Sequence, residues 1–190
     1  MQRGFRVNAR VVMITSAALI AVATGWWIAK QVSQPEAPVE STLEAPEKAP
    51  TRRTVHLYFG DAQGRYLVAE QRVVDQPADD VALGRQLVQM LIQGPEKGGS
   101  RTLPADAKVR AFFINDPETA VVDFESDSFA NHPGGVGCEL LSIYSLVNTL
   151  ALNVERIHLV KILIGGQEAA TLVGHVDLQT PFEVDMLWVR

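Results

Sequence analysis

Apolar and polar residues are distributed in three different ways along this chain of 190 residues. The run Val11–Ala29 contains no charged side chain, and the segment from residue 30 to residue 53 has almost no large apolar residue. The remainder alternates apolar with polar positions. These changes predict four parts: a basic N-terminus (1–10), a transmembrane helix (11–29), a Pro/Glu-rich linker (30–53) and a globular domain (54–190).

Within the globular part, the periodicity predicts strands and two helices. The predicted strands are Val55–Phe59, Leu67–Val74, Val109–Ile114, Ala120–Phe124, Ile157–Ile164 and Ala170–Val176, with Phe182–Val189 docked on the core as an edge strand. One helix starts at the capping residue Asp79 or Asp80 and ends at Gln93, before Gly94-Pro95. Its inner face is expected to carry Val81, Leu87, Val88 and Leu91. The second helix runs roughly from Val136 to Leu152.

The resulting order is β-β-α-β-β-α-β-β. Because most strands follow one another through short turns, we expect an α+β fold. It has a mixed or antiparallel sheet of about five to six strands, with two helices packed on one face. About 137 residues are enough to bury one stable core.

The apolar run predicts where the protein resides. About 19 residues form a helix of roughly 28 Å, which crosses the hydrocarbon core of a bilayer. Arginines precede the run, whereas the nearest charges beyond Lys30 are Glu36, Glu40, Glu44 and Glu47, so the N-terminus is expected inside and the domain outside the cytoplasm. The alternative is a signal peptide cleaved after Ala21-Val22-Ala23. We favour a single-pass anchor in the inner (cytoplasmic) membrane, because the apolar stretch continues through Trp26 and Trp27. Both interpretations make the domain periplasmic or otherwise extracytoplasmic.

Composition narrows the class of partner. The formal net charge is -5, from 17 basic and 22 acidic residues, and the basic ones are spread along the chain. We therefore expect no nucleic-acid binding, which needs clustered Lys and Arg. The single cysteine, Cys138, excludes an internal disulfide.

Small polar residues form a stripe on the second helix: Cys138, Ser142, Ser145 and Thr149. They could allow a strand or partner helix to approach closely, bond back to helix carbonyls, or supply a nucleophile. No GxSxG motif surrounds either serine, so we favour packing over catalysis. Cys138 is interpreted in the same way, as a small buried apolar residue.

Other candidate chemistry is sparse. The Gly-rich segment Asn131–Gly137 lacks the Lys and Ser/Thr of a phosphate-binding loop and carries Glu139 nearby, so we interpret it as a connection. Asp123, Glu125 and Asp127 alternate, and we expect them to line a solvated strand face. The four histidines are scattered without a zinc spacing. We therefore predict no catalytic, cofactor or metal residues.

Several stretches occur in the order and spacing of the GerMN domain, the module of sporulation and spore-germination proteins. They are VHLYFGDAQGRYLVAEQRVV, LVQMLIQGPEKGGSRTLPADAKV, AVVDFESDSF and ELLSIYSLVNTLALNVERIHLVKILIGGQEAATLVGHVDL. The most specific pieces are Tyr58-Phe59, the Leu-x-x-Gly-Pro that closes the first helix, Leu103-Pro104, Val122-Asp123, Ser145–Leu150, Gly165-Gly166 and Gly174-His175. The resemblance spans about residues 54 to 178.

The resemblance implies an exported, membrane-tethered interaction module whose fold is similar to the ring-building domains of the sporulation channel. No catalytic residue belongs to the family pattern. With one domain and a helical anchor, the layout resembles versions from non-sporulating Gram-negative bacteria. We expect a non-enzymatic scaffold that contacts other cell-envelope proteins and the inner membrane through Val11–Ala29. Self-association into a homo-oligomer is a further expectation. The alternative is a peptidoglycan-associated binder or hydrolase that uses Asp123, Glu125 or His132.

Overall fold

The computed structural model describes residues 51–115 and 118–190. In chain order its elements are β1 (Arg52–Gly60), β2 (Leu67–Asp75), α2 (Asp80–Gln93), β3 (Val109–Asn115), β4 (Thr119–Phe124), α3 (Val136–Asn153), β5 (Leu159–Ile164), β6 (Phe182–Glu183) and the 3-10 turn η1 (Met186–Trp188). The predicted order of strands and helices is confirmed from β1 to β5, and so is the α+β class.

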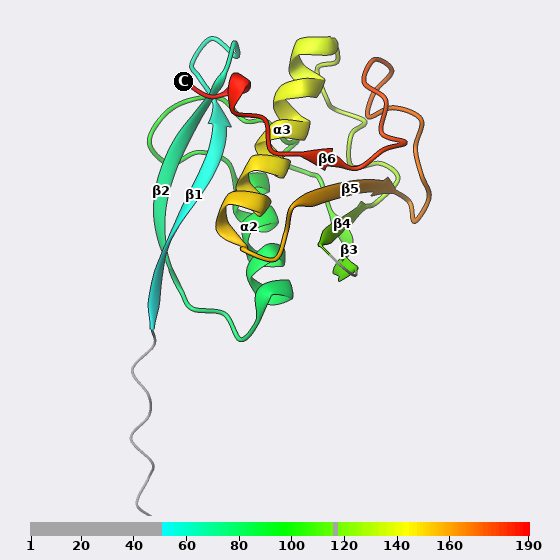
Figure 1. The fold of residues 1–190 in the computed structure, drawn as a ribbon. Helices are drawn as coiled ribbons and strands as arrows, with labels where there is room; N and C mark the ends of the chain where they lie inside the picture. Colours follow the sequence, from blue (N-terminus) through cyan, green and yellow to red (C-terminus); the bar gives the residue numbers. More distant parts are fainter. Residues whose placement is uncertain (1–50, 116–117) are drawn as a thin grey trace, which may run out of the picture. The chain divides into compact units, whose positions relative to one another are not determined.

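The strands form two sheets, not the single sheet expected from the sequence. Strands β1 and β2 make a hairpin of their own, paired antiparallel over nine residues each. The second sheet has the order β3-β4-β5-β6, with β4 and β5 parallel and the outer pairs antiparallel. Both helices contact both sheets and lie between them (Figure 1). Helix α3 is the crossover that the parallel pair β4–β5 requires.

The core fills the space between the hairpin and the larger sheet. Its largest fully buried side chains come from β1, both helices and the central strands, among them Leu57, Leu87, Ile143, Leu150 and Ile162. Asp79 caps α2 by accepting a hydrogen bond from the backbone N–H of Ala82, as the sequence predicts. Of the four residues predicted for the inner face of α2, Leu87, Val88 and Leu91 are buried. Val81 is 36% exposed because it lies in the first turn, before the helix meets the core.

Near the C-terminus one predicted strand, residues 170–176, is wrong, and the predicted edge strand after it is shorter than expected. Residues 170–176 form a loop with one isolated bridge, Thr171 to Asp177. Its backbone N–H groups are bonded by a buried side chain, Glu139, instead of by a neighbouring strand. The segment expected as Phe182–Val189 is a strand for two residues only. It then turns at Asp185. The Asp185 carbonyl accepts a hydrogen bond from the side-chain amide of Asn148 on α3, and the Asp185 N–H donates one to the oxygen of the same amide.

The predicted transmembrane helix, most of the linker, and Asp116 and Pro117 lie outside the described residues. Within residues 51–115 and 118–190, one helix, α3, is long and apolar enough to cross a membrane. It is the central helix of the domain, with most of its residues buried against the two sheets.

Candidate functional site: the two edges of the hairpin

The polar stripe of α3 closes one edge of the hairpin. Thr149 Oγ1 accepts a hydrogen bond from the Tyr58 backbone N–H at 3.1 Å. The Asn153 amide accepts from the His56 N–H at 2.9 Å and donates to the His56 carbonyl at 2.7 Å. Ser145 Oγ donates to the Tyr58 carbonyl at 2.5 Å. Side chains at every fourth position of one helix thus take the place of a neighbouring strand beside β1.

This arrangement explains why the hairpin stays separate from the larger sheet. A strand can join an edge only where backbone groups are free, and α3 occupies those of β1. The stripe therefore acts in packing, as the sequence suggested. Ser142 also bonds back to the Cys138 carbonyl at 2.9 Å. The interpretation of Cys138 as buried is wrong: it lies in the first turn of α3, outside the core, and is exposed.

The other edge of the hairpin is largely open. In an antiparallel pair, each residue directs its N–H and C=O to the same side. Because His56 and Tyr58 face α3, their partners in the ladder, Gln71 and Ala69, direct their backbone groups away from β1. The same alternation places the groups of Leu67 and Val73 on this outer side.

Two carbonyls on this outer edge of β2 have partners. The Leu67 carbonyl accepts from the Arg190 N–H at 2.9 Å, and the Gln71 carbonyl accepts from Lys97 Nζ at 3.2 Å. Within the described part of the chain, the outward N–H and C=O groups of Ala69 and Val73 have no hydrogen-bond partner. Val73 is 63% exposed, so the edge is accessible as well as unpaired.

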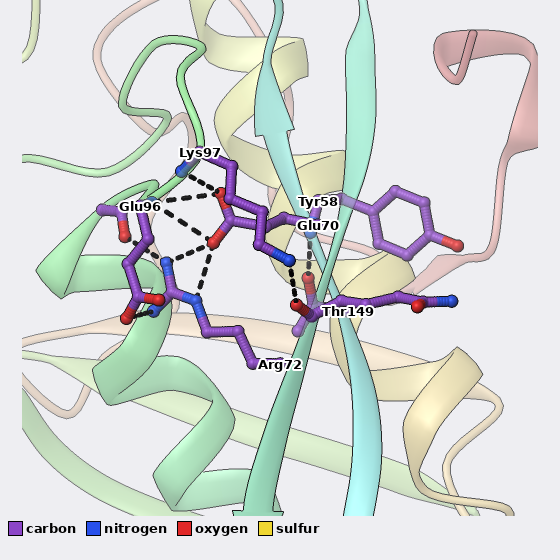
Figure 2. Close-up of polar contacts among 8 residues, drawn as sticks. Tyr58, Glu70, Arg72, Glu96, Lys97 and Thr149 are labelled. Atoms are coloured by element: carbon purple, nitrogen blue, oxygen red, sulfur yellow. Dashed lines mark hydrogen bonds and ion pairs between the residues drawn. The ribbon is translucent and has the colours of Figure 1, made fainter.

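A buried ion pair between Glu70 and Arg72 of β2 connects this strand to the loop that follows α2. Glu70 Oε1 accepts from Arg72 Nε at 2.7 Å, and Glu70 Oε2 accepts from the backbone N–H groups of Glu96 and Lys97, each at 3.0 Å. Arg72 donates to the Gly94 carbonyl at 2.7 Å. Figure 2 shows the Glu70 carboxylate between Arg72 on one side and the Glu96–Lys97 loop on the other. The loop after α2 is therefore tied to β2.

The electrostatics of Glu70 follow from these contacts. Burial by itself would raise the pKa of Glu70, but the Lys97 backbone N–H and the Arg72 guanidinium lower it below its ordinary value. The carboxylate therefore remains charged, and Arg72 also lies over the ring of Phe59, 5.4 Å from its centroid. Nothing in the sequence analysis singled out this pair. The signal was present: two opposite charges two residues apart in a strand must share a face.

A groove of about 580 Å³ runs beside the open edge. It is lined by the hairpin tip from Phe59 to Gln63 with Tyr66, by residues 68–71 of β2 and by the loop Lys97–Gly99. The loop passes so close that a Cβ on Gly99 would lie 2.6 Å from the Gly60 carbonyl oxygen. Gly99 also has a φ of 92°, which a side chain would disfavour. The groove is thus formed by close backbone packing.

A smaller cavity of about 250 Å³ is lined by His132, Ser142 and Cys138, among other residues. His132 Nδ1 accepts a hydrogen bond from the Gly134 N–H at 3.0 Å, so the ring proton is on Nε2. This Nε2–H then donates to Ser142 Oγ at 2.9 Å. His132 is oriented as a donor to the serine, which is the reverse of a general base activating a nucleophile. Burial lowers the pKa of His132 despite the attraction of Glu139, so the ring stays neutral.

The acidic residues considered for hydrolysis do not converge on this cavity. Asp123 is buried at 2% exposure, and it accepts from Arg110 Nε at 2.6 Å and the Gly166 N–H at 2.9 Å. Glu125 lies in the turn beyond β4, and neither residue lines the cavity of His132. The expected solvated strand face of Asp123, Glu125 and Asp127 is wrong, because β4 ends at Phe124 and the loop at Gly166 covers Asp123.

Glu139 is fully buried and holds a loop. Its carboxylate accepts from the N–H groups of Val173, His175 and Val176, and contacts His175 Nδ1 at 2.6 Å. Burial would raise the pKa of Glu139, but these hydrogen bonds lower it. Among the described residues, no group of three or more His, Cys, Asp and Glu side chains could hold a metal ion.

The fold and the open edge define a class of protein: a small α+β domain with its helices between a hairpin and a mixed sheet. A family model described as "Germane: Sporulation and spore germination" matches residues 56–170, more than half of the chain. The chain belongs to this family, which confirms the resemblance drawn from the sequence. No curated protein matches it.

Solved structures agree with this assignment. The tandem GerMN domains of the sporulation protein GerM from Bacillus subtilis match with 25% identity and a TM-score of 0.58, over 69% of this chain and 46% of that one. The chain therefore spans less than half of the tandem protein. A "Putative Lipoprotein from Clostridium perfringens" matches with 27% identity and a TM-score of 0.51, covering 70% of this chain and 87% of that chain. The first GerMN domain of GerM, at 23% identity and a TM-score of 0.51, covers 70% and 96% and shares the fold.

Proposed function

We propose that this protein is a non-enzymatic interaction module, tethered to the inner membrane by Val11–Ala29, which binds envelope proteins along the open edge of β2. The observation that carries the proposal is that Ala69 and Val73, beside a groove of about 580 Å³, have outward backbone groups with no hydrogen-bond partner among residues 51–115 and 118–190. An extended segment can add to such an edge through main-chain hydrogen bonds, with pockets beside the edge giving specificity.

The direct test is site-specific photo-crosslinking of the full chain in its native membrane. A photoreactive residue at Val73 is expected to capture one or a few proteins. The same residue at Arg85, on the exposed face of α2, is the matched control. If Val73 and Arg85 give the same pattern, or if Val73 captures no protein, the edge is not the binding site.

The membrane topology can be tested with the native cysteine. Cys138 is exposed in the described domain, so a membrane-impermeant maleimide should label it in spheroplasts without lysis. This outcome supports an extracytoplasmic domain held at the membrane. Association with a membrane also fits the similarity to a protein described as a lipoprotein. Labelling that requires lysis would place the domain in the cytoplasm and end this part of the proposal.

The second candidate is a cell-wall binder or hydrolase, based on the cavity of His132 and Ser142. The orientation of His132 and the separate placement of Asp123 favour the interaction module. Incubation of the full chain with muropeptides, followed by chromatography of the products, tests the alternative. Cleavage that is lost in a His132→Gln variant would replace the module with an enzyme.

A further inference from the structure

The outer edge of β2 has room for a short added segment. At one end the C-terminal tail already occupies the edge: Val189 forms a parallel bridge with Leu67, and the Arg190 N–H donates to the Leu67 carbonyl. The part that is left runs from Ala69 to Val73. A strand advances about 3.3 Å per residue, so this part is about 13 Å long and accommodates about five residues of an added strand.

Lys97 is the charged group at this free part of the edge. Its ammonium donates to the Gln71 carbonyl at 3.2 Å, from an exposed position on the loop after α2. Among residues 51–115 and 118–190 it forms no ion pair. Gln71 lies midway between Ala69 and Val73 and directs its backbone groups to the same side. The lysine therefore covers a carbonyl that an added strand would use.

The carboxylates of the groove have cations of their own within the chain. Asp61 lines the groove and pairs with Arg65 at 3.1 Å. Glu70 lines it as well and pairs with Arg72 at 2.6 Å. Glu96 does not line the groove, and its carboxylate lies 3.4 Å from the guanidinium of Arg72. Within the described part of the chain, the lysine is therefore the one charged side chain of the groove lining that has no oppositely charged partner.

We propose that the occupant of this edge is an extended segment of a partner protein with an acidic side chain at, or next to, the residue that pairs with Gln71. This inference rests on the proposed function and names the chemistry of the partner at the same edge. The Asp or Glu carboxylate of the segment binds the Lys97 ammonium and draws it from the Gln71 carbonyl. That carbonyl then accepts a backbone N–H of the added strand. One acidic residue thus supplies an ion pair and completes the ladder.

Other occupants lose one of these two interactions. A segment with neutral side chains either leaves the ammonium on the carbonyl and forgoes a ladder hydrogen bond, or displaces the ammonium without giving it an anion. A basic side chain places a like charge beside Lys97. Because Lys97 is exposed, water offsets part of the difference, and the preference for an acidic segment is expected to be severalfold.

Displayed peptides test the proposal without knowledge of the native partner. Random heptapeptides fused to a phage coat protein, with no free C-terminus, are selected against the full chain in lipid nanodiscs. Each selected peptide is then tested on an Ala69→Pro chain, in which proline removes an outward N–H that the ladder with β1 does not use. Peptides that bind the wild type and not Ala69→Pro are edge binders. Asp or Glu is expected to be enriched at one position among them.

A double-mutant cycle then assigns the preference to Lys97. For one edge-binding peptide, Lys97→Gln and replacement of the peptide's acid by its amide should each raise Kd about threefold. Both changes together should raise Kd little further, because they remove the same interaction. Lys97→Glu should raise Kd about tenfold and favour the peptide that carries lysine at the acidic position. The matched control is Lys108→Glu, the same change of charge at an exposed lysine outside the groove lining, which should leave Kd unchanged.

Far-UV circular dichroism checks that each variant is folded. If Ala69→Pro does not fold, Val73→Pro removes an outward N–H at the other end of the free edge and takes its place. The outcomes separate this inference from the proposed function. Edge binders without enrichment of Asp or Glu, or independent effects of the two changes in the cycle, overturn the acidic partner and leave the edge as a binding site. If no selected peptide distinguishes the wild type from the folded proline variant, both the inference and the proposed function fail.

Discussion

The hydrogen bond between Thr149 and β1 gives the sharpest test of how the hairpin is held. In a Thr149→Val variant the side-chain volume is nearly unchanged, but the acceptor of the Tyr58 N–H is lost. Thr149 is fully buried and Tyr58 is 7% exposed, so water does not replace the hydroxyl. An unsatisfied buried donor costs about 1–3 kcal/mol.

The expected change is measurable by thermal unfolding of the full chain in detergent. For a folded domain of about 140 residues the entropy of unfolding is about 0.3 kcal/mol per kelvin. A loss of about 2 kcal/mol therefore lowers Tm by about 7 °C. Hydrogen exchange measured by mass spectrometry adds a local readout, since peptides covering Tyr58 should exchange faster.

The control is Thr149→Ser, which keeps the hydroxyl and removes one methyl group at a cost of about 1 kcal/mol. Its Tyr58 peptides should keep their protection. If Thr149→Val unfolds at or above the wild-type temperature with unchanged exchange at Tyr58, the polar stripe of α3 does not close the edge of β1.

Three further outcomes are expected. In Gly84→Ala the new Cβ would lie 2.2 Å from Cζ of the buried Phe112, so overpacking should lower Tm by an amount that corresponds to about 1–2 kcal/mol, despite the better helix propensity of alanine. Arg72→Met leaves the Glu70 carboxylate buried without its cation, and the midpoint of urea unfolding should fall by the equivalent of about 3 kcal/mol; an unchanged midpoint would contradict the network in Figure 2. The folded pKa of Glu139 is lowered, so its contribution to stability is fully present above the unfolded value of about 4.3 and is lost as pH falls through the folded pKa. Glu139→Gln should therefore flatten the stability–pH curve below about pH 4.3, and a curve parallel to wild type would show that the carboxylate is not what holds its loop.

The strand and helix elements could mostly be predicted because their signals are local. The capping residue Asp79, the alternation along β1 and the apolar face of α3 each depend on neighbours within a few residues. The predictions fail where a side chain that is distant in the sequence determines the hydrogen bonds of a segment. Residues 170–176 have the composition of a strand, but Glu139, more than thirty residues earlier, bonds their backbone N–H groups.

At the candidate site, too, the sequence predicted the local features but not the contacts between distant residues. The sequence indicates a packing role for the stripe on α3, and the hydrogen bonds of Ser145 and Thr149 to β1 agree with it. It did not point to Glu70 and Arg72, whose partners at residues 94–97 come together only when the loop after α2 folds onto β2.

By itself, the sequence determined the order of elements as far as β5, the family and the periodicity of each face, because these depend on local propensity and spacing. Only the tertiary structure decided that the strands divide into two sheets. The reason is physical: each strand edge has one set of hydrogen-bonding groups, and whether a helix or another strand satisfies them depends on which segments pack together. Helix α3 took the edge of β1, and on the outer edge of β2 the backbone groups of Ala69 and Val73 are left without a hydrogen-bond partner among the described residues.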